Sequence, residues 1–381
     1  METMSPMSAG NVSAWHYLTR KPVRLSWDNG RIVSVERTDT APSKNLWMAP
    51  ALFDVQVNGY GGVDFQQDHL QEADLLKAIR ALRRDGCARI LLTLITDQWD
   101  QLTARLIHLK GLRDNHPELQ SAIAGWHIEG PFLSEKPGFH GAHNPAFMLN
   151  PTPAHIRELR DITGSDPLLL TLAPERNGAI GATEMATSLG IRVSIGHTNA
   201  PAEVLQAAVK AGATGFTHLG NGCPRELDRH DNLLWRVFET PGLTVGVIPD
   251  SIHVSPAPFR LFHKVLPSIY YTTDAMSAGG MPPGRYRISS LEVEVGEDQI
   301  VRQPGKSNFA GSALRPVDGI RRAVQMLGCS WQEAWMRFSH QPARLMGLEA
   351  GLEPGLPAHF CVVQTDGNNS VEDVKTYLNG Q

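Results

Sequence analysis

Eight apolar, β-prone runs recur along the middle of this chain, and segments with helical periodicity separate most of them. Strands that alternate with helices predict an α/β fold with a parallel sheet, because parallel neighbours need a crossover connection. Eight such units are the number that closes a (β/α)8 barrel of the TIM type. The predicted strands are residues 52–57, 89–96, 123–129, 168–173, 192–197, 215–219, 243–248 and 269–274.

The two ends of the chain predict a second, smaller domain made of β-strands. Two strands flank a turn at Asn29 and Gly30 near the N-terminus, and two further β-prone runs lie near the C-terminus. A chain of 381 residues is long enough for a barrel and such a domain. The predicted boundaries are residues 1–48 plus 349–381 for a small β-sandwich domain formed by both termini, and 49–348 for the barrel.

The composition argues against several classes of partner. The formal net charge is −4 and no basic run is present, which predicts no nucleic-acid partner. No apolar run approaches the roughly 20 residues needed to cross a bilayer, so no membrane partner is expected. The four cysteines are scattered without CxxC spacing, as expected of a reduced, cytoplasmic protein. A small anionic substrate stays compatible with this charge, because local charge can differ from net charge.

Polar residues stand at the predicted C-terminal ends of several strands, where a barrel of this type carries its active site. Glu129 ends the third run, His197 ends the fifth, the sixth contains His218, and Asp274 ends the eighth. Polar side chains at the ends of apolar strands cost free energy unless they are paired, so their convergence predicts a functional site. His127 lies on the same side of the third strand and competes with Glu129, which we favour because it stands at the very end.

Glu129, His197 and His218 form a set of three metal ligands. Two imidazoles and one carboxylate with an open fourth position suit catalytic zinc, while iron, manganese and cobalt accept the same donors. Water bound to such an ion has a pKa of about 7 and is a nucleophile at neutral pH. We expect Asp274 to take a proton from that water and to pass it to the leaving group.

A set of short motifs in a fixed order gives the chain a resemblance to a known family. The motifs are HIEGPFL (127–133), GAHNP (141–145), GHTNA (196–200), THLGNGCP (217–224), IPDSIHV (248–254), YTTDAMSAGG (271–280), AGSAL (310–314) and GLEPGLPAHFCVV (351–363). Together they resemble the N-acetylglucosamine-6-phosphate deacetylase family of the amidohydrolase superfamily, over nearly the whole chain. The resemblance implies a barrel of the amidohydrolase type and hydrolysis of an N-acetyl group.

The first predicted strand leads into Gln56-x-Asn58, where many metal-dependent hydrolases carry His-x-His. Amides are poor zinc ligands beside imidazole and carboxylate. In the family that the chain resembles, Gln-x-Asn can replace His-x-His, and such members look like single-metal enzymes. The resemblance therefore implies one divalent ion per subunit, zinc before the other metals, held by the three ligands named above. Gln56 and Asn58 are then expected at the substrate, with simple strand capping as the structural alternative.

The resemblance also assigns residues to the substrate. His143, in the Gly-x-His-Asn element, is implied to polarise the acetyl carbonyl, and the extra residues before that element leave His140 as an alternative. An arginine in the charged loop after the sixth strand is implied to bind the phosphate, with Arg225 competing against Arg229. The implied substrate-binding residues are Gln56, Asn58, Asn221, Gly222, Arg229 and His253.

The expected reaction is hydrolysis of N-acetylglucosamine-6-phosphate to glucosamine-6-phosphate and acetate. The charged loop at 220–232 departs from the family pattern, so N-acetylgalactosamine-6-phosphate or an unphosphorylated N-acetyl sugar are alternative substrates. A non-catalytic barrel that binds a sugar phosphate is a less favoured alternative, because Asp274 and the three ligands are all present. The resemblance implies a homodimer.

Overall fold

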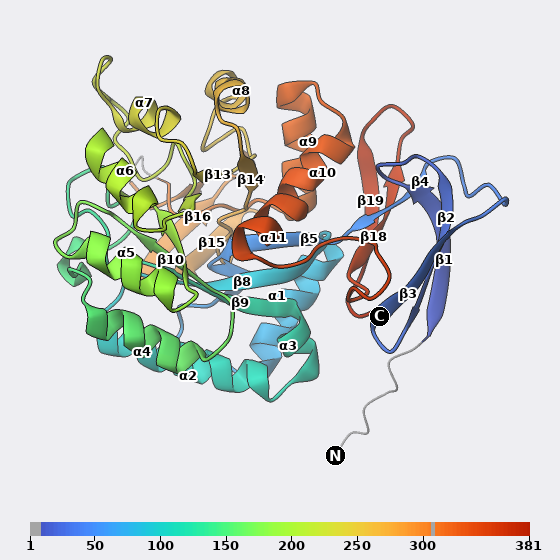
Figure 1. The fold of residues 1–381 in the computed structure, drawn as a ribbon, viewed down its shortest axis with the longest axis horizontal. Coiled ribbons are helices and arrows are strands. Elements are labelled where there is room, and N and C mark those ends of the chain that lie inside the picture. Colours follow the sequence, from blue (N-terminus) through green and yellow to red (C-terminus); the bar gives the residue numbers. More distant parts are fainter. Residues whose placement is uncertain (1–8, 306–308) are drawn as a thin grey trace.

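The computed structural model describes residues 9–305 and 309–381, and its centre is a barrel of eight parallel strands (Figure 1). Each of these strands pairs in parallel with the next one along the chain. The predicted (β/α)8 barrel is therefore confirmed. Its strands are β5 (Leu52–Val57), β8 (Cys87–Ile95), β9 (Ile123–Glu129), β10 (Leu168–Leu172), β11 (Arg192–Ile195), β12 (Gly215–Phe216), β13 (Thr244–Val247) and β14 (Ile269–Tyr271).

Helices follow the strands and cover the outside of the barrel (Figure 1). In the first of them, Leu75, Ala78, Ile79 and Leu82 are buried, which is the i, i+3, i+4, i+7 spacing of one helical face. The helix ends before Gly86, whose φ of 94° suits glycine. The helices are α1 (Glu72–Arg84), α2 (Trp99–Asp114), α3 (Pro117–Ala122), α4 (Pro153–Thr163), α5 (Ala179–Ser188), α6 (Ala202–Lys210), α7 (Leu233–Phe238), α8 (Pro256–Val265), α9 (Pro316–Leu327), α10 (Trp331–Phe338) and α11 (His340–Met346).

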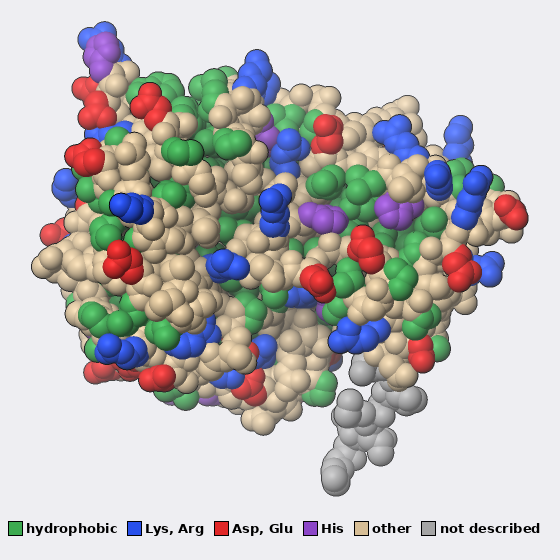
Figure 2. Space-filling model, in the orientation of Figure 1, with side chains coloured by type: hydrophobic (Ala, Val, Ile, Leu, Met, Phe, Trp, Pro, Cys, Tyr) green, Lys and Arg blue, Asp and Glu red, His purple; other side chains and the backbone are tan. Residues whose placement is uncertain are grey.

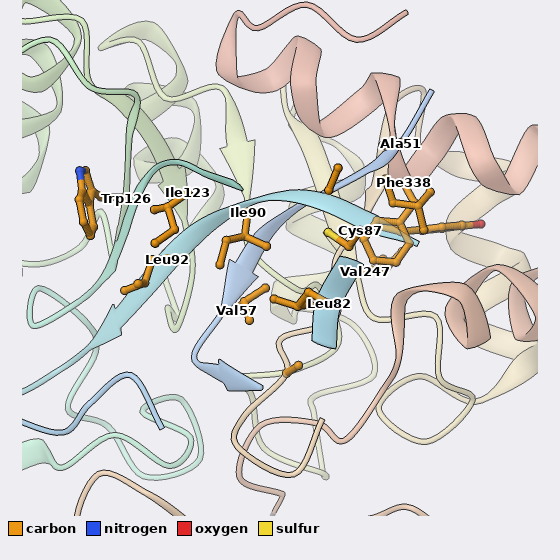
Figure 3. Packing of buried hydrophobic residues seen from close by; sticks show 14 of the residues in the cluster. Ala51, Val57, Leu82, Cys87, Ile90, Leu92, Ile123, Trp126, Val247 and Phe338 are labelled. Carbon is orange, nitrogen blue, oxygen red and sulfur yellow. The ribbon is translucent and has the colours of Figure 1, made fainter. Parts of the chain in front are cut away.

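The main core lies between the barrel strands and the helices (Figure 3). Ile90 and Leu92 on β8 pack there with Leu82 of α1, and Trp126 on β9 belongs to the same cluster. Every residue of β5 is buried, as expected for a parallel strand that has helices on one side and the barrel interior on the other. Burial at about 25 cal/mol per Å² makes such a core the main stabilising contribution to the fold.

Both chain ends build one six-stranded sheet beside the barrel, with the order β19-β18-β4-β1-β2-β3 (Figure 1). The ring of Trp27 on β2 lies 5.3 Å from that of Phe360 on β18, although two strands separate them in the sheet. The sheet therefore curls over itself around a small core, and the expected small β domain formed by both termini is confirmed. Residues 1–8 lie outside the described residues, and the domain boundaries stay predictions. The strands are β1 (Gly10–His16), β2 (Pro22–Asp28), β3 (Arg31–Arg37), β4 (Leu46–Pro50), β18 (Phe360–Thr365) and β19 (Val371–Tyr377).

Further short strands, which were not expected from the sequence, lie in the connections after β5 and β14. Two of them form a small antiparallel pair, and three form an antiparallel sheet after β14. One residue of that sheet, Ile288, lines a large cavity. These elements are β6 (Gly59–Tyr60), β7 (Val63–Asp64), β15 (Gly284–Ile288), β16 (Leu291–Val295) and β17 (Val301–Arg302), and a 3-10 turn covers Pro145–Phe147.

The surface view agrees with the mixed charge pattern of the sequence. On the face in Figure 2, acidic and basic side chains are interspersed over the barrel and the small domain, without a large area of one sign. Within the part of the chain that the structure describes, no helix is long and apolar enough to cross a membrane.

Candidate active site

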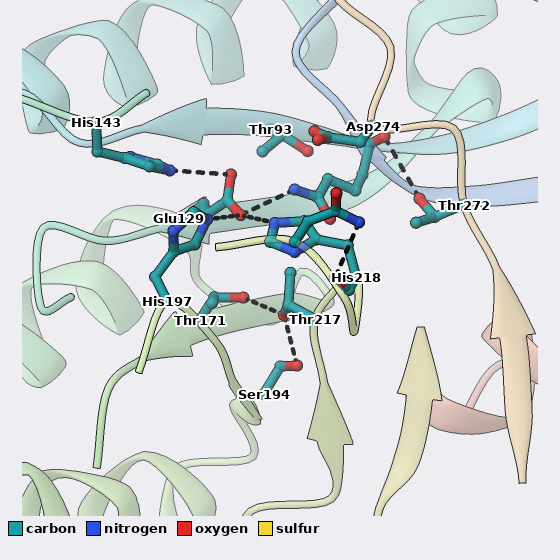
Figure 4. Close-up of polar contacts among 12 residues, drawn as sticks. Thr93, Glu129, His143, Thr171, Ser194, His197, Thr217, His218, Thr272 and Asp274 are labelled. Carbon is teal, nitrogen blue, oxygen red and sulfur yellow. Dashed lines mark hydrogen bonds and ion pairs between the residues drawn. The ribbon is translucent and has the colours of Figure 1, made fainter. Parts of the chain in front are cut away.

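Three imidazoles surround one buried carboxylate at the C-terminal end of the barrel (Figure 4). The carboxylate belongs to Glu129, the last residue of β9. Its oxygens lie 2.8 Å from Nε2 of His218, 3.4 Å from Nε2 of His197 and 3.6 Å from Nε2 of His143. The structure thus brings the three predicted ligands together, and it adds His143 to the same cluster.

The backbone turns sharply where these side chains enter the site. The strands β11, β12 and β14 end two or three residues before His197, His218 and Asp274, so these residues lie in loops, and the prediction that placed them inside strands was wrong. Their φ angles are 50°, 30° and 50°, in the left-handed region that side chains other than glycine rarely adopt. Such backbone strain concentrates at functional sites, because the surrounding structure must hold it.

The ring of His197 is fixed in one tautomer. Its Nδ1 lies 2.9 Å from the carbonyl oxygen of Phe139, which can only accept, so Nδ1 carries the proton. Nε2 is therefore the ring atom that can present a lone pair, and it faces Glu129. Gly141 and Gly222 pack against this ring, and a Cβ on either residue would lie 2.8 Å from a ring atom. Gly222, predicted at the substrate, therefore also shapes the place of a proposed ligand.

His143 can adopt either of two roles, depending on its tautomer. Its Nδ1 lies 2.9 Å from the hydroxyl of Thr96, which donates or accepts equally well. If Nδ1 donates, Nε2 presents a lone pair toward Glu129; if the hydroxyl donates, Nε2 carries a proton. Glu129, His143 and His197 offer ligand atoms that all lie within 4.8 Å of one another. His143 is thus placed either to bind a metal or to donate a hydrogen bond.

This donor set fits a divalent metal ion. Two or three imidazoles with one carboxylate are the ligands that catalytic zinc prefers. The lone pair of His197 and the carboxylate of Glu129 face each other across 3.4 Å, an arrangement that a cation between them relieves. In addition, Nδ1 of His218 is buried without a hydrogen-bond partner among the described residues. The Phe139 carbonyl and the Thr96 hydroxyl orient two of the rings, as outer partners of metal ligands do.

His127, the competitor of Glu129, lies deeper in the barrel. Its Nε2 lies 2.8 Å from the hydroxyl of Thr171, and its Nδ1 lies 3.4 Å from that of Thr93. Burial lowers the pKa of His127 to about 4, so the ring is neutral at pH 7. Its hydrogen-bond partners are thus hydroxyl groups of the barrel interior, while Glu129 faces the other imidazoles.

The two amides after the first strand donate to the two carboxylates of the site. Nε2 of Gln56 lies 2.9 Å from Oε1 of Glu129, and Nδ2 of Asn58 lies 2.7 Å from Oδ1 of Asp274. Asn58 lines the large cavity, as expected of a residue at the substrate, but Gln56 is not among the lining residues. Gln56 instead directs its amide to Glu129. At these two positions, N–H groups of amides stabilise the negative charge of the carboxylates in place of cations.

Asp274 has the environment of a general base. Burial, followed by the charge of Glu129, raises the pKa of Asp274 to about 7. A base with a pKa near the working pH accepts and returns a proton most efficiently. Its Oδ1 receives the hydrogen bond from Asn58, and the residue lines the cavity.

The cavity in front of the cluster has a volume of about 710 Å³, the size of a small-molecule site. Of the two arginines in the charged loop, Arg225 lines it and Arg229 does not. Arg229 is exposed, and its carbonyl accepts a hydrogen bond from Nε1 of Trp235. Other candidates from the sequence that line the cavity are His140, Asn221, Gly222 and His253.

His253 forms a pair with Asp250 on the cavity wall. Nδ1 of His253 lies 2.6 Å from Oδ2 of Asp250, whose other oxygen accepts from the His253 N–H at 2.8 Å. Burial opposes the charged imidazole, but the charge and hydrogen bond of Asp250 outweigh it and raise the pKa of His253. The pair can therefore present a cationic N–H to an anionic group in the cavity.

Sequence reasoning missed several residues that build this site. Thr96 and the carbonyl of Phe139 lie in loops and carry no motif of their own. Asp54 is a charged residue in a fully buried strand, two positions before Gln56 and on the same side. A buried charge requires partners, so that position was a signal in the sequence.

Comparisons with known proteins agree with this geometry. A relative from Bos taurus is 32% identical over 375 residues, which cover 94% of this chain and 88% of the relative. A relative from Danio rerio is 31% identical over 351 residues, which cover 89% of this chain and 84% of the relative. Both are named N-acetylglucosamine-6-phosphate deacetylase. A relative from Escherichia coli O157:H7 is named N-acetylgalactosamine-6-phosphate deacetylase. It is 30% identical over 339 residues, which cover 88% of this chain and 87% of the relative. No family model matches the chain.

Solved structures give the same result. A mutant N-acetyl-D-glucosamine-6-phosphate deacetylase from Mycobacterium smegmatis, in complex with N-acetyl-D-glucosamine-6-phosphate, superposes with a TM-score of 0.86 at 28% identity, covering 98% of this chain and 99% of that one. An enamidase of the amidohydrolase superfamily matches with a TM-score of 0.57 at 13% identity, which shows a shared fold alone. From the coverage and identity of these relatives, the chain belongs to the N-acetylglucosamine-6-phosphate deacetylase family.

Proposed function

We propose that this protein hydrolyses the N-acetyl group of N-acetylglucosamine-6-phosphate and releases glucosamine-6-phosphate and acetate. The observation that carries the proposal is the placement of Asp274 beside the Glu129 cluster at the bottom of a cavity of about 710 Å³. A base with a pKa of about 7 next to a set of metal-ligating side chains suits metal-assisted amide hydrolysis. The names of the Bos taurus and Danio rerio relatives support the substrate.

One divalent ion, with zinc as our first choice, is proposed to be held by Glu129, His197 and His218. The closest contact of the cluster, 2.8 Å between His218 and Glu129, and the fixed tautomer of His197 support this set. When bound, a divalent ion supplies Lewis acidity toward the amide carbonyl and lowers the pKa of water. Because Gln56 and Asn58 present N–H groups to the two carboxylates, a second ion has no place beside them.

The protein's own residues are proposed to move the protons and to orient the substrate. Asp274 takes a proton from the attacking water and returns it to the amine that leaves. His143, in the tautomer in which Thr96 donates to Nδ1, directs an Nε2–H toward the acetyl oxygen and stabilises the negative charge that develops there. Asn58 keeps the Asp274 carboxylate in place through the 2.7 Å hydrogen bond.

The phosphate of the substrate is proposed to lie toward His253 and the loop after β12. His253 is held by Asp250 and can donate to an anion, and Asn221 and Gly222 line the same cavity. Of the two arginines in that loop, Arg225 is the better candidate because it lines the cavity. The role expected for Arg229 from the sequence stays a prediction.

N-acetylgalactosamine-6-phosphate is a second candidate substrate, favoured by the name of the Escherichia coli O157:H7 relative. The two sugars differ only in the configuration of one hydroxyl, so the same cluster can act on both. The homodimer and the cytoplasmic location expected from the sequence stay predictions.

The experiment that tests the proposal is acetate release by zinc-loaded protein. N-acetylglucosamine-6-phosphate, N-acetylgalactosamine-6-phosphate and unphosphorylated N-acetylglucosamine are offered separately, and kcat/KM is compared. Preference for the first supports the proposal, and preference for the second moves the assignment to the alternative sugar. If only the unphosphorylated sugar is turned over, the proposed phosphate site is excluded. Binding without acetate release from any of them identifies a non-catalytic sugar-phosphate-binding protein.

A further inference from the structure

The first and last strands of the barrel are joined mainly by side chains. Among residues 9–305 and 309–381, β14 and β5 stand at the two ends of the sheet order and are not ladder neighbours. Val57 and Ala275 form an isolated parallel bridge between the two segments, and the Asn58 N–H donates to the Ala275 carbonyl at 2.7 Å. Below this bridge, the carboxylate of Asp54 spans the gap.

Asp54 is fully buried on β5 and accepts hydrogen bonds from both sides of that gap. Its Oδ1 accepts from the Thr272 hydroxyl and from the Gln56 N–H at 3.2 Å. Its Oδ2 accepts from Thr273 twice, from the N–H at 3.0 Å and from the hydroxyl at 2.6 Å. Four donors occupy the lone pairs of a carboxylate that would otherwise be costly to bury. Burial still raises the pKa of Asp54 to about 6.

The residue that follows this cluster is Asp274. Its φ of 50° is unfavourable for a side chain other than glycine, so its neighbours must hold it. On one side, Thr273 is bound by Asp54. On the other, the Ser312 N–H donates to the Asp274 carbonyl at 2.9 Å, and the Ser312 hydroxyl donates to the Thr273 carbonyl at 2.5 Å. The Asp274 carboxylate is directed to the Asn58 amide from this backbone.

We propose that Asp54 is a positioning residue for the reaction. Through Thr272 and Thr273 it ties the last strand to the first and keeps Asp274 in the left-handed backbone that directs its carboxylate into the site. Asp54 does not line the cavity, so it acts through Asp274 and not on the substrate. This inference rests on the proposed function, in which Asp274 is the base.

The test uses the metal-loaded full chain and substitutions on both sides of the contact. Asp54→Asn converts one acceptor oxygen into a donor that faces other donors, and Thr273→Val removes a donor but keeps the shape. Both variants are expected to lower kcat by about 10- to 100-fold, because a displacement of the Asp274 carboxylate by about 1 Å costs that much in rate. KM is expected to stay within about threefold of the wild-type value, and the metal content is expected to be unchanged. Thr273→Ser keeps the hydroxyl and is expected to stay within about threefold of wild-type kcat.

Asp64→Asn is the matched control. Asp64 is also buried and accepts from two backbone N–H groups, those of Gln66 and Ser289, and burial raises its pKa to about 6 as well. It has no hydrogen bond to Thr272, Thr273 or Asp274 among the described residues. The control is expected to lower Tm as much as Asp54→Asn does, while kcat of the folded fraction stays within about threefold.

Two results would overturn the inference. One is a kcat for Asp54→Asn that falls no further than that of Asp64→Asn, and the other is equal kcat for Thr273→Val and Thr273→Ser. If Asp54→Asn does not fold, the two Thr273 variants decide the question. Asp274→Asn and the wild type are measured in the same series. If the wild type releases no acetate, the proposed function fails. If Asp274→Asn stays active, Asp274 is not the base, and if it is inactive while Asp54→Asn and Thr273→Val are active, only the positioning role fails.

Discussion

The side-chain amide of Asn58 donates to Oδ1 of Asp274 across 2.7 Å, and so connects the end of the first barrel strand to the loop after the last. Gln56, two residues earlier, donates in the same way to Glu129 at 2.9 Å. Each amide therefore stabilises one carboxylate of the site without adding charge. This relationship explains how a chain without His-x-His on its first strand keeps both carboxylates buried, and it agrees with a site for one ion.

Replacing the proposed base tests the reaction most directly. Asp274→Asn leaves one oxygen to accept from Asn58, so the fold and the bound metal are expected to persist. Turnover is expected to fall by about 10²- to 10⁴-fold, because the amide cannot take a proton from water. Acetate release and metal content are measured together. Asp298→Asn, on an exposed turn, serves as the control, and appreciable activity in Asp274→Asn would remove this residue as the base.

The metal content of single histidine variants separates ligands from the residue that polarises the carbonyl. His197→Ala and His218→Ala are expected to lose most of the bound ion after dialysis. His143→Ala is expected to retain it and to lose about 10²- to 10³-fold in kcat, as expected when one donor to the developing oxyanion is removed. Exposed His69→Ala is the control. Loss of the ion from His143→Ala, together with retention in His218→Ala, would instead assign Glu129, His143 and His197 as the ligands.

The two arginines of the charged loop give opposite expectations. Arg225→Ala is expected to raise KM for the phosphorylated sugar by about 10- to 100-fold, since a hydrogen bond to a charged group contributes about 1.5–3 kcal/mol. Both arginines are exposed, but Arg229 does not line the cavity, so Arg229→Ala is expected to change KM by less than about threefold. Steady-state kinetics with phosphorylated and unphosphorylated sugar measure both. A larger increase in KM for Arg229→Ala than for Arg225→Ala would instead assign the phosphate contact to Arg229.

The neutral imidazole of His127 predicts a pH dependence of stability. Its pKa is about 4 in the folded protein against a usual value of 6.5, so the unfolded chain binds more protons between these two values. The stability contribution is therefore present above pH 6.5 and is lost as the pH falls toward 4, by about 3 kcal/mol in all.

Urea unfolding at several pH values measures this contribution. His127→Gln, whose amide can both donate and accept hydrogen bonds but does not titrate, is expected to show a smaller loss of unfolding free energy over that range than the wild type. His69→Gln, on the surface, is expected to leave the wild-type slope unchanged. Parallel pH profiles of the wild type and His127→Gln would show that the ring is not the titrating group.

The sequence predicted the barrel and the centre of the site because both depend on patterns that are local. Apolar runs alternating with helical segments define the strands, and a charged or polar residue at the end of such a run, as at Glu129, has few structural roles. Asn29 and Gly30 likewise predicted their turn, which the structure confirms with φ angles of 50° and 74°.

The remaining features depend on contacts between distant parts of the chain. The contact of His143 with Glu129 depends on the path of the long loop after β9, which no periodicity describes. The choice between Arg225 and Arg229 depends on the conformation of one irregular loop. The partners of Asp54, Thr272 and Thr273, lie more than two hundred residues away in the sequence, so its role can be recognised only from the folded barrel.

The small β domain has a consequence for synthesis of the chain. Phe360 on β18 pairs with Pro50 on β4, and it follows that residue by 310 positions. At roughly 5–20 residues per second, a ribosome needs about 15–60 s to make the intervening polypeptide. Throughout that interval one edge of β4 has no neighbour, because the strand that covers it has not yet been translated. The domain that the N-terminus begins is therefore completed only after the whole barrel has been synthesised.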